Sequence, residues 1–310
     1  MTPKVTIVIP AYNLEMYIGE CLESVLCQKT KFPFKVVVSD DASTDRTPQI
    51  LQEYQKKYPD VLKVILKEKN SGSYLNAIQL LDRIDSEYIS YLDGDDFWIG
   101  ENRLQHQVDF LDANPQYVLC SGQTCFFVDG KQGNAIVPKG LMGKSYTFSD
   151  AFKTPILFHT SGLLLRNVIY RYGMPYYYYS AAYTFEACVM NGEDVRRIIH
   201  LEKGPLFVLP EMVSGYRLHD KGEWTGMREA QKALEGAISA HWYKKFYLNK
   251  YPNLRVELEQ YERDLYMKMW ATLVNKKHVY PNYDLNEHET MLLTEFLREL
   301  QRENRVMECG

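Results

Sequence analysis

Short apolar runs rich in β-branched residues alternate with segments of helical periodicity along the first 98 residues. The runs that predict buried strands are residues 5–9, 34–38, 61–66 and 87–92. Between them, apolar residues recur at spacings of three or four, which predicts a helix in each interval. Strands that alternate with helices predict an α/β fold with a mostly parallel, doubly wound sheet. Such a sheet binds its ligands beyond the carboxyl ends of its strands.

The pattern becomes helical in the last part of the chain. Before that change, the sequence predicts a helix that follows Trp98 and stops near Asn114, and strands at residues 117–121, 125–128 and 205–209. Beyond Gly222, apolar residues keep spacings of three or four almost to the end. We therefore predict an α/β domain at residues 1–222 and a helical C-terminal extension at residues 223–310.

Carboxylates follow both the second and the fourth predicted strand. They are Asp40 and Asp41 in the first case and Asp93, Asp95 and Asp96 in the second. Because the carboxyl ends of parallel strands meet at one edge of a sheet, we expect the two acidic clusters to share one site. Like charges this close repel unless a cation or hydrogen-bond donors hold them, and hard oxygen ligands suit Mg²⁺ or Mn²⁺. The alternative is a solvated acidic turn, because loops are rich in Asp.

Composition and charge narrow the range of functions. Of the 310 residues, 45% are hydrophobic and 25% are charged, which is ordinary for a soluble globular protein. A net charge of −4 gives no electrostatic reason to expect nucleic acid as a partner. The sequence shows no signal-peptide pattern and no apolar run long enough to span a bilayer, so we expect a cytoplasmic protein. The six cysteines form no C-x-x-C pair and predict reduced thiols rather than disulfides or structural zinc.

Four motifs follow one another in the part of the chain that ends near residue 222. They are Val5-Thr-Ile-Val-Ile-Pro-Ala-Tyr-Asn13, Val38-Ser-Asp40-Asp41-Ala-Ser-Thr-Asp45, Asn70-x-Gly72 and Tyr88-Ile-Ser-Tyr-Leu-Asp93-Gly-Asp-Asp96-Phe-Trp98. Together they resemble the family 2 glycosyltransferases, which have the GT-A fold. The resemblance implies an inverting transferase that uses a nucleotide-diphosphate sugar, expected to be a UDP-sugar, together with Mn²⁺ or Mg²⁺. It also implies a glycan or lipid-linked hydroxyl acceptor, in the assembly of a surface polysaccharide or another glycan.

The resemblance places the nucleotide-sugar against these motifs. Pro10, Ala11 and Tyr12 would line the nucleotide base, and Asp41 would hydrogen-bond the base or the ribose. The other positions of the donor site would be Asn13, Asn70, Gly72, Asp93 and Gly94.

The resemblance places the metal at the fourth motif. Asp95 would ligate the ion that bridges the two phosphates, and Asp93 would touch the ribose or the metal; the ion would stabilise the leaving diphosphate as a Lewis acid. Tyr216-Arg217-x-His219 resembles the family's frequent Tyr-Arg-x-His, whose histidine approaches the metal or the diphosphate. A structural role for His219 is an equal alternative. The residues that would orient the acceptor side or support the turn are Asp96 and Trp98.

Inversion by a single displacement also needs a base opposite the leaving group. Family members place this carboxylate late, in a Glu-Asp or Gly-Asp motif before an amphipathic helix. Gly192-Glu193-Asp194 occupies that place, so the resemblance favours Asp194 as the base, with Glu193 second and Glu186 third. The following residues, Val195-Arg-Arg197, depart from the mostly apolar residues of relatives, which leaves the choice between Asp194 and Glu193 open.

Other functions fit the pattern less well. A nucleotidyltransferase would also bind a nucleotide and a metal through paired acids, but it usually opens with a Gly-rich basic loop where Pro10-Ala-Tyr-Asn13 stands here. A catalytically inactive scaffold would keep the fold and bind partners through the extension, but the chain retains every expected carboxylate. A dinucleotide-dependent oxidoreductase would carry G-x-G-x-x-G after the first strand, and this sequence does not.

The sequence leaves the roles of two segments open. The tyrosines at residues 176–179 form either a packed loop or an aromatic binding wall, and packing is the commoner role of such residues. The extension combines aromatic residues such as Trp242 and Trp270 with lysines such as Lys244 and Lys245. This mixture suits packing onto the first domain, a homodimer through the C-terminal helices, or peripheral contact with the acidic inner face of a membrane.

Overall fold

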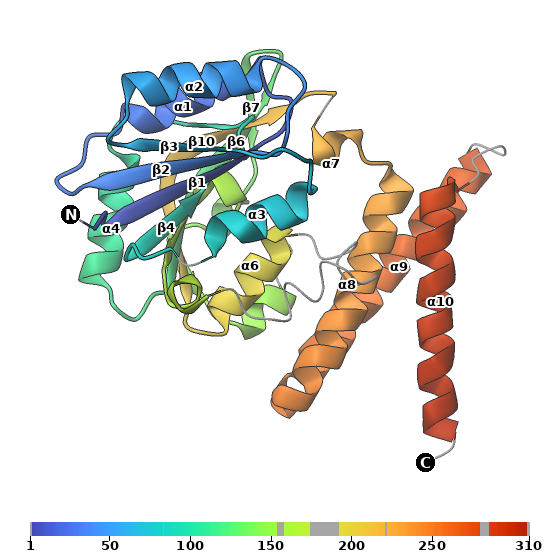
Figure 1. The fold of residues 1–310 in the computed structure, drawn as a ribbon. Helices are drawn as coiled ribbons and strands as arrows, with labels where there is room; N and C mark the ends of the chain where they lie inside the picture. Colours follow the sequence, from blue (N-terminus) through green and yellow to red (C-terminus); the bar gives the residue numbers. More distant parts are fainter. Residues whose placement is uncertain are drawn as a thin grey trace. The chain divides into compact units, whose positions relative to one another are not determined.

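The structure is a computed structural model that describes residues 2–82, 84–153, 158–173, 192–220, 222–279 and 285–308. Within these ranges, the side chains at 192–195, 223–224, 275–279 and 303–308 are not described. The chain forms two compact units (Figure 1). One contains the sheet and ends at Gly222, and the other contains the helices that begin at Glu223.

Four parallel strands form one half of the sheet. In spatial order they are β3 (Leu62–Leu66), β2 (Phe34–Asp40), β1 (Val5–Ala11) and β4 (Tyr88–Tyr91). Helices α1 (Ile18–Leu26) and α2 (Thr47–Lys57) cover one face, and α3 (Ser73–Leu81) lies on the opposite face (Figure 1). Helices on both faces bury β1, β4 and most of β2, and this explains why their sequences are nearly continuous apolar runs, whereas β3 at the edge of the sheet stays partly exposed. The predicted α/β, doubly wound fold is confirmed.

The other half of the sheet is mixed. Its strands are β9 (Leu163–Arg166), β6 (Leu119–Val128), β10 (Leu206–Leu218) and β5 (Phe97–Trp98), with β7 (Lys131–Ala135) beside β6 and β8 (Lys144–Tyr146) beside β10. β6 and β10 run parallel, whereas β9 is antiparallel to both β4 and β6. β5 pairs antiparallel with β10, so the last part of β10 lies directly beside the segment that follows the acidic turn.

Two strand predictions were too short. The two strands predicted at residues 117–121 and 125–128 are parts of one strand, β6, which begins at Leu119. Its polar central residues continue the strand because they are buried and have hydrogen-bond partners. The Oγ1 of Thr124, for example, lies 2.7 Å from the Oγ of Ser214. The strand predicted at residues 205–209 continues as β10 to Leu218, past irregular pairing between Val208 and Ser214. A pattern of apolar positions does not identify either feature.

The core of the sheet unit fixes the strands that lead to the acidic residues. Helix α4 (Arg103–Ala113) packs with α1 and α2 against the sheet. Ile7, Ile9, Leu22, Leu51 and Leu104 in this core are fully buried. Burying each such side chain contributes about 1.5–3 kcal/mol relative to exposure. Helix α6 (Gly192–Leu201) and the short turns η1 (Lys139–Leu141), η2 (Ser149–Phe152), η3 (Thr160–Gly162) and η4 (Tyr170–Tyr172) complete the described elements of this unit.

The second unit is helical, as predicted for the C-terminal extension. It contains α7 (Glu223–Gly226), α8 (Glu229–Lys250), η6 (Pro252–Leu254), α9 (Arg255–Val279) and α10 (Glu287–Glu308). Leu234, Met269 and Phe296 belong to a core shared by α8, α9 and α10. Asn286 and Glu289 form a reciprocal cap at the start of α10, because each side chain accepts a hydrogen bond from the other residue's backbone N–H. None of the helices in the described ranges is both long enough and apolar enough to cross a bilayer.

Candidate functional site

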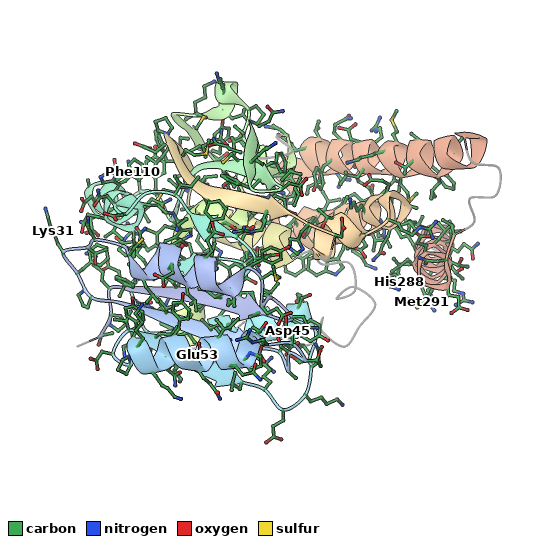
Figure 2. The ribbon with its side chains drawn as sticks, turned by 90° about the horizontal axis from the view of Figure 1, so that it is seen from above. Lys31, Asp45, Glu53, Phe110, His288 and Met291 are labelled. Carbon is green, nitrogen blue, oxygen red and sulfur yellow. The ribbon has the colours of Figure 1, made fainter. Side chains whose placement is uncertain are left out.

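The carboxyl ends of β1, β2 and β4 meet at one edge of the sheet. Ala11 pairs with Asp40, and Val8 pairs with Tyr91, two residues before Asp93. Figure 2 shows Asp45 in the loop after β2, at the opposite end of the sheet from Lys31, which precedes β2. Both predicted acidic clusters therefore begin at the same edge.

Asn13 connects the loop after β1 to the loop after β2. Its φ of 55° lies in the left-handed region, which Asn tolerates better than most residues. Its backbone N–H donates to the Oγ of Ser43 at 2.8 Å, and its Oδ1 accepts from the N–H of Thr44 at 2.8 Å. Ser43 in turn donates to Asp40. These bonds hold the chain around Pro10 and Tyr12, and Tyr12 is 47% exposed and therefore accessible to a ligand.

Asp41 is buried by the loop that precedes α3. Its carboxylate accepts from the backbone N–H of Ser71 and Gly72, at 3.0 and 2.8 Å, and from the Oγ of Ser71 at 2.7 Å. The ammonium of Lys67 lies 3.1 Å away. Burial raises the pKa of this carboxyl, but the bonds from Ser71 and Lys67 outweigh burial and hold the pKa below its ordinary value. Asp41 therefore ties the end of β2 to the loop Asn70–Gly72.

Gly72 needs to be glycine for a conformational reason. Its φ is +85°, where an L side chain is strained, and it stands immediately before α3. Its N–H also donates to the Oδ1 of Asn70 at 2.9 Å. Asn70 and Gly72 thus shape a tight turn next to Asp41.

The acidic turn follows β4 and packs tightly against the end of β1. The carbonyl of Asp93 accepts the N–H of Asp96 at 2.9 Å, which closes the turn. A Cβ on Gly94 would lie 2.9 Å from the carbonyl oxygen of Pro10 and 2.8 Å from Leu14 Cδ1. Gly94 therefore allows the turn to approach β1.

Replacing Gly94 with alanine should destabilise the sheet unit by about 1–3 kcal/mol, because the added methyl group overlaps the Pro10 carbonyl. Thermal unfolding of the full chain measures this effect. Gly140→Ala is the matched control, since nothing lies within 4 Å of a Cβ built there. Equal melting temperatures for the two variants would contradict the close approach.

Asp95 and His219 face each other beside the turn. Nε2 of His219 lies 3.0 Å from Oδ2 of Asp95, and the two side chains are 9% and 20% exposed. His219 follows the end of β10, which β5 and β6 hold in place. The structure thus brings together two residues that are 124 positions apart in the sequence.

Asp96 is the buried member of the turn. Its Oδ1 accepts from the N–H of Arg217 at 3.0 Å, and its Oδ2 accepts from the Oγ of Ser161. Nδ1 of His159 lies 3.9 Å from Oδ2. Burial, followed by the charges of Asp95 and Asp93, raises the pKa of Asp96 well above its ordinary value. With no exposed surface, Asp96 connects the turn to β10 and η3.

Trp98 is also buried. Its backbone N–H donates to the Oγ of Ser24 at 2.9 Å, and the guanidinium carbon of Arg103 lies 3.8 Å from the centre of the Trp98 ring. Of the two alternatives that the sequence left open for Asp96 and Trp98, these contacts favour support of the turn.

Of the three predicted base residues, the structure describes only the backbone of Glu193 and Asp194. Glu193 and Asp194 lie in the first turn of α6, but their side chains are among those not described. Glu186 and the tyrosines at 176–179 lie outside the described residues.

Sequence reasoning gave no role to four residues around the turn: Tyr17, Glu20, His159 and Arg217. The motif Tyr216-Arg217-x-His219 contained a signal for Arg217, but only its histidine received a role. Tyr17 and Glu20 have no motif, because their place beside the turn depends on the pairing of β5 with β10.

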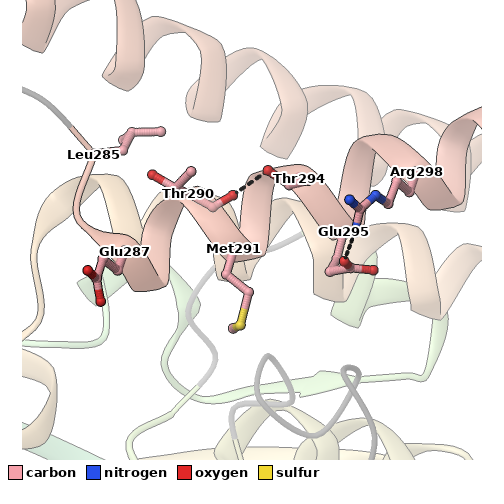
Figure 3. Close-up of a pocket in the computed structure, with 7 residues that line it drawn as sticks. All are labelled: Leu285, Glu287, Thr290, Met291, Thr294, Glu295 and Arg298. Atoms are coloured by element: carbon pink, nitrogen blue, oxygen red, sulfur yellow. Dashed lines mark hydrogen bonds and ion pairs between the residues drawn. The ribbon is translucent and has the colours of Figure 1, made fainter.

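A separate hollow of about 450 Å³ lies along α10 in the helical unit (Figure 3). Leu285, Thr290 and Met291 line it, and two of its three charged residues, Glu295 and Arg298, form an ion pair. This pairing makes the hollow a weaker candidate than the acidic edge of the sheet.

Comparison with known proteins agrees with this geometry. A doubly wound sheet with an Asp-Gly-Asp-Asp turn at its carboxyl edge is a GT-A type of fold. The family model named Glycosyl transferase family 2 matches residues 6–173, and the chain belongs to that family.

Relatives in this family share part of their length with this chain. An uncharacterised protein of Mycobacterium tuberculosis is 32% identical over 220 residues, which cover 71% of this chain and 60% of that protein. Poly(ribitol-phosphate) beta-N-acetylglucosaminyltransferase TarS of Staphylococcus aureus is 37% identical over 118 residues, 37% of this chain and 20% of that protein. The chain thus spans less than two thirds of the length of these relatives.

Solved structures have the same fold. S. aureus TarS 1–349 in complex with UDP-GlcNAc superposes with a TM-score of 0.59 at 19% identity, covering 93% of this chain and 78% of that one. The mannosyltransferase PcManGT from Pyrobaculum calidifontis, in complex with GDP-Man and Mn²⁺, gives a TM-score of 0.56 at 18% identity, covering 96% and 80%. The predicted GT-A fold is confirmed.

Proposed function

We propose that this protein is a metal-dependent, inverting glycosyltransferase that moves a sugar from a UDP-sugar to a hydroxyl acceptor. The observation that carries the proposal is the contact between Asp95 and His219 at the edge where β1, β2 and β4 end. An α/β sheet binds ligands at this edge, and a carboxylate facing an imidazole there suits a cation and a diphosphate.

We propose that the nucleotide lies along the ends of β1 and β2. Pro10, Ala11 and Tyr12 would line the base, with Tyr12 as an exposed ring on which it stacks. Asp41 would act on the base or the ribose directly, or through the loop that its carboxylate holds. The remaining donor contacts would come from Asn13, Asn70, Gly72, Asp93 and Gly94. TarS, named with UDP-GlcNAc, supports UDP as the nucleotide.

The donor set fits a divalent cation. Carboxylate oxygen and imidazole nitrogen both bind Mn²⁺, and Asp95 and His219 present one of each. Within the described ranges, no three His, Cys, Asp or Glu side chains gather as a metal site. Few protein ligands are needed, since Mg²⁺-type sites often use one or two carboxylates plus substrate phosphates and water. We propose Asp95 and His219 as ligands, and Asp93, which does not gather with them, as a contact to the ribose. Bound there, Mn²⁺ or Mg²⁺ would neutralise charge on the leaving diphosphate.

We propose Asp194 as the base, with Glu193 as the alternative. The acceptor hydroxyl oxygen forms a bond to the anomeric carbon while the bond from that carbon to the diphosphate oxygen breaks. The hydroxyl proton passes to the carboxylate, and the nucleoside diphosphate leaves with the bonding electrons. Asp96 and Trp98 would keep the turn in place during this step, because both are buried beside it.

Replacing Asp41 with alanine should weaken binding of UDP and of UDP-sugar equally, by about 1–3 kcal/mol, the scale of charge-assisted hydrogen bonds. The loss arises whether Asp41 contacts the nucleotide or holds Ser71 and Gly72 beside it. Isothermal titration of both ligands measures it. An unchanged affinity for UDP would remove Asp41 from the nucleotide site.

A turnover assay tests the proposed function. UDP-GlcNAc, UDP-glucose and GDP-mannose are each incubated with the full chain, Mn²⁺ and a glycan or lipid-linked acceptor, and the released nucleotide is identified. Release of UDP with transfer of sugar supports the proposal. Release of sugar 1-phosphate, with the nucleoside monophosphate transferred to the acceptor, would indicate a nucleotidyltransferase, and binding without turnover would indicate an inactive scaffold. Release of GDP alone would identify the donor as a GDP-sugar and not a UDP-sugar.

We also propose that residues 1–222 are the catalytic domain and that residues 223–310 serve partners or location. The acceptor would be a glycan or a lipid-linked glycan of a surface polysaccharide; the relative TarS is named for poly(ribitol-phosphate), a polymer that carries hydroxyl groups. The helical extension would act by packing, by homodimer formation, or by contact with the inner face of the membrane, in a cytoplasmic protein. Light scattering and flotation with anionic vesicles, before and after truncation at Gly222, distinguish these roles.

A further inference from the structure

Arg217 connects three elements around the acidic turn. Its backbone N–H donates to Oδ1 of Asp96 at 3.0 Å, and its Nε donates to the carbonyl oxygen of Asp95 at 2.8 Å. Its Nη2 donates to Oε2 of Glu20 on α1 at 3.0 Å. One residue at the end of β10 thus holds two consecutive residues of the turn and links them to a helix.

Tyr17 packs against the same arrangement. Its ring centre lies 4.5 Å from that of His219 and 5.1 Å from the guanidinium carbon of Arg217. The ring centre of Phe97 lies 4.9 Å from the same guanidinium carbon. Tyr17 and Glu20 are three positions apart at the start of α1, so they lie on the same side of the helix.

These contacts determine how the proposed metal ligands are presented. The carbonyl of Asp95 is bonded to the same Cα that carries the carboxylate, so fixing that carbonyl restricts the direction of the side chain. His219 follows Arg217 by two residues, and Tyr17 packs on its ring. Nε2 of His219 is then 3.0 Å from Oδ2 of Asp95. Both members of the pair depend on the Arg217 and Tyr17 contacts.

We propose that Arg217, supported by Glu20 and Tyr17, is a positioning residue that holds Asp95 and His219 in the geometry for binding a divalent cation. The inference rests on the proposed function and names the residues that prepare its metal site. A lysine cannot replace Arg217, because only the planar guanidinium donates toward Asp95 and Glu20 from a rigid fork.

Mn²⁺ binding tests this role directly. Free Mn²⁺ is measured by electron paramagnetic resonance with the full chain and UDP, for the unaltered protein, Arg217→Lys and Glu20→Gln. Arg217→Lys should weaken Mn²⁺ binding about 10- to 100-fold, the range for residues that orient metal ligands. Glu20→Gln should weaken it about two- to fivefold, because this ion pair is partly exposed.

Arg166→Lys is the matched control for stability. Arg166 on β9 donates to the carbonyl of Leu111 at 2.9 Å and packs on the ring of Tyr88, at the start of β4 rather than at its carboxyl end. The Arg166→Lys variant should have a lower melting temperature than the unaltered protein but the same Mn²⁺ affinity.

The outcomes separate the two proposals. Normal Mn²⁺ affinity in both Arg217→Lys and Glu20→Gln, while the unaltered protein binds Mn²⁺, overturns the positioning role alone. Equal losses of affinity in Arg217→Lys and Arg166→Lys overturn it as well, since the effect would then follow stability. If Arg217→Lys does not fold, Glu20→Gln decides between support and rejection. Failure of the unaltered protein to bind Mn²⁺ with UDP overturns both this inference and the proposed metal dependence.

Discussion

Replacing Asp95 with alanine should abolish Mn²⁺-dependent donor binding and lower sugar transfer by about 10³-fold, while the protein stays folded. A bound metal contributes several kcal/mol to stabilising the leaving diphosphate, and each 1.36 kcal/mol is a factor of ten in rate. The side chain of Asp95 is partly exposed and pairs with His219, so its loss leaves the core intact. Transfer kinetics, Mn²⁺ binding and thermal unfolding measure the three parts of this prediction.

Asp109→Ala is the matched control for Asp95→Ala. Asp109 is an exposed carboxylate on α4 that accepts a hydrogen bond from Gln105, one helical turn earlier. It should behave like the unaltered protein in all three measurements. If Asp95→Ala kept Mn²⁺-dependent binding of UDP, Asp95 would not be a metal ligand.

Replacing Asp194 with asparagine should lower transfer by about 10²- to 10⁴-fold and leave donor binding nearly intact. Asparagine keeps the size of the side chain and most of its hydrogen bonding, but it cannot take the acceptor proton. Titration with UDP and single-turnover kinetics separate binding from the chemical step.

Glu193→Gln provides the comparison, because it makes the same change one residue earlier in α6. Near-normal transfer is expected for this variant. If Glu193→Gln lost transfer while Asp194→Asn kept it, the base would be Glu193. If neither variant mattered, Glu186 or an acid between residues 130 and 180 would be the base.

The parallel half of the sheet and its acidic edge could be predicted because they depend on local signals. The strands that end at Ala11 and Asp40 are continuous apolar runs, and each stops at turn residues. Parallel pairing brings such ends together, which is why the sequence predicts one site for the two acidic clusters, at Asp40 and Asp41 and at Asp93 to Asp96. The close approach of Gly94 to β1 follows from the same geometry.

The mixed half of the sheet could not be predicted because its signals are not local. Thr124 and Ser214 are polar, but each is buried and satisfied by the other. The role of Arg217 depends on β10 passing beside β5, more than a hundred residues earlier in the chain. Periodicity reports no partner at that distance, and the motif Tyr216-Arg217-x-His219 gave a role to its histidine alone.

The most direct test of the account is the position of the metal in a crystal of the full chain grown with UDP and Mn²⁺. Anomalous diffraction at the manganese edge locates the ion without reference to the protein coordinates. If Asp95 and His219 are the metal ligands, one strong manganese peak lies within coordination distance of a carboxylate oxygen of Asp95 and Nε2 of His219, in contact with the diphosphate. A peak on other residues, or UDP bound with no peak at Asp95, would contradict this assignment.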